Sequence, residues 1–213
     1  MKWLGVTAAM TVAGAALAGG YQVHPDVGNS TLTAVFDAKL GERITALSSQ
    51  VACDATVDVK AGMVNGTCTV PLTSLMVDNE PTKTEHFQQW TTHKKGESKD
   101  CTLEAAFTGV KLDAALKEGT PAAFTAQVPF RVCGRARTDG GKEKVTGTVT
   151  LLPPGNILKV RAHVDAFNRE RYQIGPKWTE GWLSRVQQLA PVVAAEGTLD
   201  LNLFAKDSSV MKP

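Results

Sequence analysis

Apolar and polar residues alternate one by one along most of the chain. Between residues 51 and 59 every odd position is apolar or small, whereas the even positions carry Ala, Asp or Thr. A period of two is typical of a strand with one dry face and one wet face. The same alternation recurs over residues 32–38, 64–72, 103–109, 122–132, 145–151, 158–166 and 199–203. Antiparallel sheets give this pattern and parallel sheets buried on both faces do not, so we predict an all-β chain of eight antiparallel strands.

Two segments depart from the alternation. Apolar side chains recur at helical spacing within residues 84–94, which predicts a short helix there. A second apolar stripe begins with Trp178 and Trp182 and ends before Pro191, which predicts an amphipathic helix over residues 177–189. Such a helix would cover one end of a barrel or pack on its outside.

Eight antiparallel strands can form a sandwich or close into a barrel, and closure removes the exposed edges. The inward positions favour a hollow barrel because many of them are small. They are Ala34, Ala38, Ala55, Gly66, Ala105, Gly109, Ala122, Ala126, Gly147, Ala162 and Ala166. A solid core needs larger side chains to reach interior packing density, whereas an apolar space suits an apolar guest. Alternation does not determine the distance between strands, so a tight sandwich with a solid core remains the alternative.

The N-terminus resembles a secretory signal peptide. Lys2 precedes an apolar run over residues 3–15, and Ala16-Leu17-Ala18 has the small-x-small form of a cleavage site. The run is too short and too rich in Ala and Gly to be a good membrane span. We therefore expect a signal peptide over residues 1–18, a single domain over residues 19–213 and a periplasmic or secreted location.

The four cysteines are expected in disulfides, because an exported chain meets an oxidising compartment. One hairpin register places Cys53 directly opposite Cys68. For Cys101 and Cys133 the alternation fails, since Cys133 falls on the polar face, and a bulge near Pro129 would restore the pairing. We predict both disulfides, Cys53–Cys68 and Cys101–Cys133, with free buried thiols as the alternative.

Charge and motifs exclude several classes of function. The formal net charge is +2, from 23 basic and 21 acidic residues, which argues against a nucleic-acid partner. No Cys and His residues lie at zinc-finger spacing, so we expect no metal site. There is no G-x-S-x-G, H-E-x-x-H, P-loop or G-x-G-x-x-G motif, so we predict no catalytic residues and no enzyme. Scattered residues can converge without a motif, which leaves an enzyme acting on a lipid as the least favoured alternative.

Two stretches of sequence resemble the YceI-like family. Residues 70–79, VPLTSLMVDN, followed by KTEHF at 83–87 and Trp90, are similar to a family segment in which a strand ending in Ser-Leu or Ser-Val leads into a basic-acidic-x-His-Leu helix. Residues 166–175, AFNRERYQIG, resemble the family's Ile-x-Arg-x-x-Phe/Tyr-Gly-Ile block. The order and spacing of these motifs extend the resemblance over the whole chain after the signal peptide.

The resemblance implies a lipocalin-like barrel, with one or two short helices at its ends, that sequesters an amphiphilic lipid. The family's ligands are polyisoprenoid quinones and related long-chain molecules, so we expect a polyisoprenoid, a quinone or a fatty-acid-like guest and no other cofactor. Thr84 replaces the family's Asp, Phe87 replaces its Leu, and the predicted helix at 177–189 reads as an insertion. These departures weaken the quinone assignment more than the lipid-binding one.

The inward faces and the family motifs together predict a set of ligand-binding residues. Large inward side chains are expected to line the cavity, with ordinary core packing as the alternative; they are Phe36, Phe107, Phe124 and Phe130. Tryptophans are expected to roof its opening, unless they only pack helix against barrel; they are Trp90, Trp178 and Trp182.

Polar candidates come from the family motifs. His86 would hydrogen-bond a headgroup, or else serve as a structural hydrogen-bonder. Arg169 and Tyr172 match the second family block, and Arg169 would meet a headgroup oxygen or equally a carboxylate such as Glu170 or Asp165. The expected partner is a hydrophobic small molecule, with no integral membrane segment after signal cleavage, and a homodimer is left open. The competing hypothesis is an exported structural or protein-interaction β domain.

Overall fold

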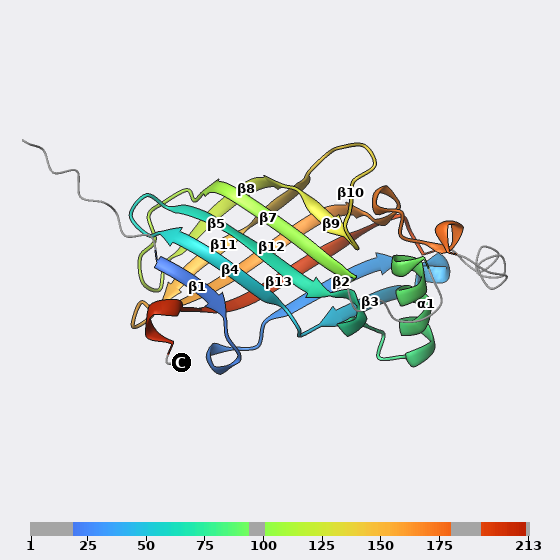
Figure 1. The fold of residues 1–213 in the computed structure, drawn as a ribbon, viewed down its shortest axis with the longest axis horizontal. Coiled ribbons are helices and arrows are strands. Elements are labelled where there is room, and N and C mark those ends of the chain that lie inside the picture. The colour runs from blue at the N-terminus through green and yellow to red at the C-terminus, as the bar shows by residue number, and fades with distance from the viewer. Residues whose placement is uncertain (1–18, 94–100, 180–192, 212–213) are drawn as a thin grey trace, which may run out of the picture.

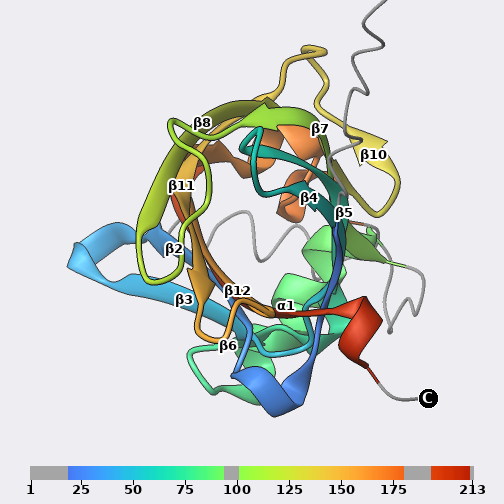
Figure 2. The same ribbon diagram turned by 90° about the vertical axis from the view of Figure 1, so that its left-hand side faces the viewer.

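A computed structural model describes residues 19–93, 101–179 and 193–211, and these form one large antiparallel sheet (Figure 1). The strands are β1 (Gly19–Val23), β2 (Thr31–Asp37), β3 (Arg43–Ser48), β4 (Ala52–Asp58), β5 (Met63–Pro71), β6 (Met76–Val77), β7 (Thr102–Lys111), β8 (Pro121–Val128), β9 (Phe130–Val132), β10 (Arg135–Ala136), β11 (Glu143–Leu152), β12 (Ile157–Asn168) and β13 (Glu196–Asp207). Their order is β10-β9-β7-β5-β4-β1-β13-β12-β11-β8, and β2, β3 and β6 branch from β13. The sheet curls around a central axis (Figure 2).

All eight predicted strands are present, but the predicted number of strands is wrong. The described residues form thirteen strands, because β1, β3, β6 and β10 were not predicted and the segment 122–132 is split into β8 and β9. The split falls at Pro129, which has no N–H to continue a ladder. In β3 the alternation is hidden because Leu47 is apolar yet 47% exposed.

The predicted closed barrel is also wrong, because the sheet has a seam between β7 and β8. The two edges join at one end, where β7 pairs with β9, and at the other end through a bridge between Leu112 and Phe124. No strand pairing links residues 107–111 to residues 125–128 in the described structure. A Gly with positive φ, Gly109 at 64°, lies within this stretch of β7.

Two residues that were predicted to face inward do not, because a bulge shifts each of their strands. The register of β5 and β7 shifts next to Gly109, which is exposed, and the following Val110 faces the interior instead. In β12 a shift between Val164 and Phe167 leaves Ala166 exposed and buries Phe167. A bulge adds one residue to a strand, so every later side chain changes face.

Both predicted disulfides are confirmed. Cys53 pairs with Cys68 in the predicted hairpin register, with their Cα atoms 4.1 Å apart. The Cys101–Cys133 disulfide joins Cα atoms 4.2 Å apart. The predicted bulge at Pro129 is not its cause, since the buried even positions continue through β9 to Val132. Cys133 instead leaves that face in a turn, with φ of 47°.

The helix predicted over residues 84–94 is confirmed as α1 (Pro81–Thr92), which begins earlier because Pro81 favours the first helical position. The predicted helix over residues 177–189 falls mostly on residues 180–192, which lie outside the described residues together with Trp182. Its described start belongs to a short 3-10 turn, η5 (Pro176–Trp178). Within the described chain, no helix combines the length and apolar character needed to cross a membrane.

Candidate functional site: an apolar lumen with one solid end

The curled sheet encloses two adjoining cavities. The inner chamber has a volume of about 150 Å³ and the outer chamber about 440 Å³. Three leucines line both chambers and form a waist between them; they are Leu32, Leu103 and Leu199. The outer chamber lies against α1 at one end of the barrel, and the inner chamber lies deeper inside the sheet. We call the two chambers together the lumen.

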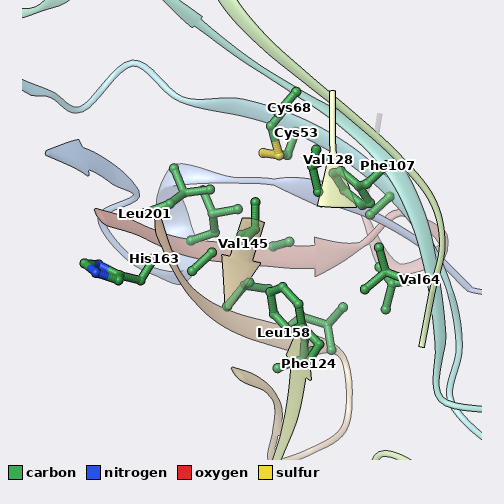
Figure 3. Close-up of a pocket in the computed structure, with 18 of the residues that line it drawn as sticks. Cys53, Val64, Cys68, Phe107, Phe124, Val128, Val145, Leu158, His163 and Leu201 are labelled. Carbon is green, nitrogen blue, oxygen red and sulfur yellow. A yellow bond between two sulfur atoms is a disulfide. The ribbon is translucent and has the colours of Figure 1, made fainter. Parts of the chain in front are cut away.

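Side chains from most of the long strands line the inner chamber, and nearly all of them are hydrocarbon (Figure 3). Three of the predicted phenylalanines are among them, namely Phe107, Phe124 and Phe130. The predicted Cys53–Cys68 disulfide also borders this space. His163 borders it as well, but its ring points away from the apolar cluster and hydrogen-bonds Asp165 and Asp200 at 2.8 and 2.7 Å.

Three phenylalanines of the described sheet lie across from glycines on the neighbouring strand. The cross-strand pairs are Phe107 with Gly66, Phe124 with Gly147 and Phe36 with Gly197. A Cβ atom at Gly66 or Gly147 would come within 2.9 or 2.8 Å of the facing phenylalanine ring. The aromatic ring covers the missing side chain and lies along the wall. These glycines therefore seat the rings and leave the lumen open.

The small residues do not all line the lumen as predicted. Only Ala34, Ala55, Ala105 and Ala162 of the eleven border a chamber, and all eleven belong to the described chain. Gly66 and Gly147 lie beneath phenylalanine rings instead. The lumen is hollow, but small side chains are only part of the reason.

The inner chamber ends at a solid floor. The floor is a cluster of buried side chains; its members are Tyr21, Val57, Leu112, Leu116, Ala122, Val149, Leu151, Leu158 and Ala205. Leu116, Ala122 and Leu151 belong to this cluster without bordering the inner chamber. The other members border it; they are Tyr21, Val57, Leu112, Val149, Leu158 and Ala205.

The connection from β7 to β8, residues 112–120, lies at this end of the curled sheet, and we call it the floor strap. On one side the N–H groups of Leu112 and Leu116 donate to the carbonyls of Gly62 and Val59, at 2.8 and 3.0 Å. On the other side the N–H of Gly119 donates to the carbonyl of Leu151 at 2.8 Å. Main-chain hydrogen bonds thus attach the strap to the β4–β5 turn on one side and to the end of β11 on the other.

Polar side chains border the outer chamber. Lys83 and His86 on α1 line it together with Trp90, and Phe36 on β2 lines it as well. The Nζ atom of Lys83 donates to Asp78 Oδ2 at 2.9 Å. Hydrogen bonds to Asp78 and Glu80 raise the pKa of Lys83, so the ammonium group stays charged beside the chamber.

Arg169 lines the outer chamber, but it has none of the predicted carboxylate partners. Its guanidinium donates to the carbonyls of Ala194, Ile174 and Val193 at 3.0, 2.7 and 2.7 Å. It also lies 5.5 Å from the centre of the Trp90 ring. Glu170 pairs with Lys177. Burial lowers the pKa of Arg169, and the charge of Glu170 opposes this only in part. Arg169 thus ties together the segments around the outer chamber.

Two predicted residues are not brought to the lumen. Tyr172 is fully buried behind Phe167, on which it stacks at 5.1 Å, and its hydroxyl donates to Glu143 Oε1 at 2.7 Å. Burial and the Glu143 carboxylate raise the pKa of Tyr172. Trp178 lies in η5 with Lys177 Nζ 4.1 Å from its ring, and it borders neither chamber.

The structure therefore assembles Phe36, His86, Trp90 and Arg169 around the outer chamber and the other three phenylalanines around the inner one. The sequence reasoning missed the waist leucines, Leu112 and Lys83. The waist leucines were visible as inward positions and Lys83 as part of the first family motif. Nothing in the sequence showed that they meet.

Comparison with known proteins identifies solved structures with a similar fold. No protein-family model and no curated protein matches the chain. Among solved structures, it is similar to a polyisoprenoid-binding domain from Saccharophagus degradans implicated in plant cell wall breakdown, at 15% identity over 88% of this chain and 98% of that one, with a TM-score of 0.59. It is also similar to BcnA of Burkholderia cenocepacia, at 14% identity over 83% and 96% of the chains, with a TM-score of 0.50. The predicted resemblance to the YceI-like proteins is confirmed at the level of the fold.

Proposed function

We propose that this protein is an exported, non-catalytic carrier that sequesters one amphiphilic lipid, polyisoprenoid, quinone or fatty-acid-like, in its lumen. The observation that carries the proposal is the inner chamber, a cavity inside the curled sheet that is bordered almost wholly by hydrocarbon. Apolar cavities with a few polar groups at one end are the usual form of a small-molecule binding site. The polyisoprenoid-binding domain with the same fold supports the class of ligand.

The distribution of polar groups supports one orientation of the guest. Burying an unpaired polar group costs about 2–7 kcal/mol, so a headgroup is disfavoured in the inner chamber. Lys83 and His86 can hydrogen-bond a headgroup in the outer chamber. The tail then passes the waist and enters the inner chamber.

The disulfides support export. Both disulfides are of the kind that persists in the periplasm or outside the cell, and the signal-peptide pattern over residues 1–18 agrees with that location.

Native mass spectrometry of the full chain, recovered from the periplasm or the medium, tests the proposal. We expect an adduct with the mass of one lipid, and organic extraction of the same sample should release it. A hydrophobic fluorescent probe should bind the extracted protein with one site. If no apolar molecule co-purifies and the probe does not bind, the proposal fails and an interaction domain becomes the better description.

A further inference from the structure

The ionisable side chains that border the outer chamber are all basic. Of the described residues around it, three can carry a charge, namely Lys83, His86 and Arg169. No aspartate or glutamate is among these described lining residues. A few polar groups in an otherwise apolar cavity determine the orientation and the chemistry of its ligand. A headgroup in the outer chamber therefore meets positive charge, with no carboxylate from the described lining to compete for it.

The fold already supplies a counter-charge for one of these three side chains. The Nζ atom of Lys83 lies 2.9 Å from Asp78 Oδ2 and 3.3 Å from Glu80 Oε1, so two carboxylates balance its charge. The His86 side chain, in contrast, has no hydrogen-bond or ion-pair partner within the described chain. Its two ring nitrogens are therefore available to a ligand.

Arg169 is a buried cation without a carboxylate partner. It begins η4 (Arg169–Tyr172) and is 4% exposed. A guanidinium group has five N–H groups, and three of those on Arg169 donate to main-chain carbonyls, which leaves two. The neighbouring Glu170 pairs with Lys177 Nζ at 2.9 Å instead. Burial of a charge is costly unless the charge is paired, so a counter-ion in this chamber would stabilise Arg169.

We propose that the outer chamber is a binding site for an anionic headgroup, a carboxylate or a phosphate monoester, which Arg169 and His86 bind while the tail passes the waist. This inference rests on the proposed lipid-binding function and narrows its ligand from amphiphilic lipids in general to acidic ones. A carboxylate or phosphate oxygen accepts charge-assisted hydrogen bonds from the guanidinium, which are stronger than those to a neutral oxygen. A quinone or an alcohol supplies no counter-charge.

Arg135 offers a matched control for Arg169. Its half-buried guanidinium also donates to main-chain carbonyls, those of Thr91 and Tyr172 at 2.6 and 3.1 Å, but it borders neither chamber. Arg169→Gln and Arg135→Gln each remove a positive charge and hydrogen bonds to carbonyls, so both carry a structural cost. Only Arg169→Gln removes charge from the outer chamber.

The test compares three ligands with the same tail, namely myristic acid, myristyl phosphate and myristyl alcohol. Each competes with an uncharged hydrophobic fluorescent probe for the full-length mature protein at roughly pH 8, where carboxylates are ionised. We expect the acid, the phosphate or both to bind at least about tenfold more tightly than the alcohol. In Arg169→Gln this preference should fall to about twofold or less, and the affinity for the alcohol should change less than that for the acid. Arg135→Gln should keep the preference of the wild type.

The outcomes separate the two proposals. If none of the three ligands displaces the probe and none binds directly, the lipid-binding function fails. If the alcohol binds the wild type as tightly as both anions do, lipid binding stands and the anionic site is overturned. Tighter binding of the acid than of the phosphate supports a carboxylate lipid, and the reverse supports a phosphate lipid.

The variants test the assignment to Arg169. A folded Arg169→Gln protein that keeps the full preference, or an equal loss of preference in Arg135→Gln, overturns it. If Arg169→Gln does not fold, His86→Leu supplies a second variant, because the His86 side chain has no hydrogen bond within the described chain. An unaltered preference in His86→Leu overturns the placement of the headgroup beside His86.

Discussion

One end of the curled sheet is filled with side chains and the other end is hollow. At the floor, aliphatic side chains and the floor strap fill the interior, and several residues are almost completely inaccessible. Toward α1, the strands that continue from this floor enclose about 440 Å³ of space, bordered by Trp90, Arg169 and Lys83. At the floor, the strap adds Leu112 and Leu116 to the packed cluster, whereas α1 borders an open space at the other end. The comparison shows that the empty space inside the sheet depends more on the segments that pack against its ends than on its strands.

The largest expected effect is on stability and contrasts a floor leucine with a wall leucine. Leu151→Ala removes a side chain from the solid floor and should lower the free energy of unfolding by about 2–5 kcal/mol. Leu201 borders the inner chamber and already faces empty space, so Leu201→Ala should cost only about 1–2 kcal/mol. Urea unfolding followed by circular dichroism measures both. Equal losses would show that the chamber is packed as tightly as the floor.

A second prediction compares the buried tyrosines at the two ends under alkaline conditions. Burial raises the pKa of Tyr172 and of Tyr21 above the ordinary tyrosine value of about 10, so the folded state keeps both protonated where the unfolded state loses its protons. Their stabilising contribution is therefore complete below about pH 10 and is lost as the pH rises above it. Tyr172→Phe should flatten this decline more than Tyr21→Phe, because Tyr172 is fully buried against the Glu143 carboxylate.

The Tyr172→Phe variant also loses the hydrogen bond to Glu143, which should cost about 1–3 kcal/mol near neutral pH. Urea unfolding at a series of pH values measures both quantities. A decline with pH that is the same in wild type and in Tyr172→Phe would contradict the assignment.

The smallest expected effect concerns the polar end of the lumen. Lys83→Gln removes a positive charge beside the outer chamber. The Lys83 side chain is partly exposed and already paired with Asp78. We expect binding of a fatty acid to weaken about two- to fivefold, and binding of an alcohol of the same length to change less. Displacement of a fluorescent probe gives both affinities. A larger loss for the alcohol would place the headgroup elsewhere.

Much of the wall could be predicted from the sequence, because period-two alternation and one hairpin register are local properties. The register that joins Cys53 to Cys68 follows from a single turn. The match between Phe107 and Gly66 does not, since it requires the pairing of β5 with β7 across a long intervening segment. Bulges at Gly109 and after Val164 also change faces without a local signal.

The floor could not be predicted for a related reason. Residues 112–120 carry no regular alternation and read as an ordinary loop. Their role depends on hydrogen bonds to Val59, Gly62 and Leu151, which lie far away in the sequence. The sequence thus predicted part of the lining of the lumen, but it predicted neither the floor nor the waist.

Two neighbouring alanines provide the most direct test of the central claim that the lumen is a binding site. Ala105 borders the inner chamber, whereas Ala106, the next residue of β7, is exposed on the outer face. Titration of a hydrophobic probe into Ala105→Leu and Ala106→Leu compares the same substitution on the two faces of one strand. The account predicts that Ala105→Leu folds and loses most probe binding, while Ala106→Leu binds like the wild type. Unchanged binding in a folded Ala105→Leu variant would contradict it.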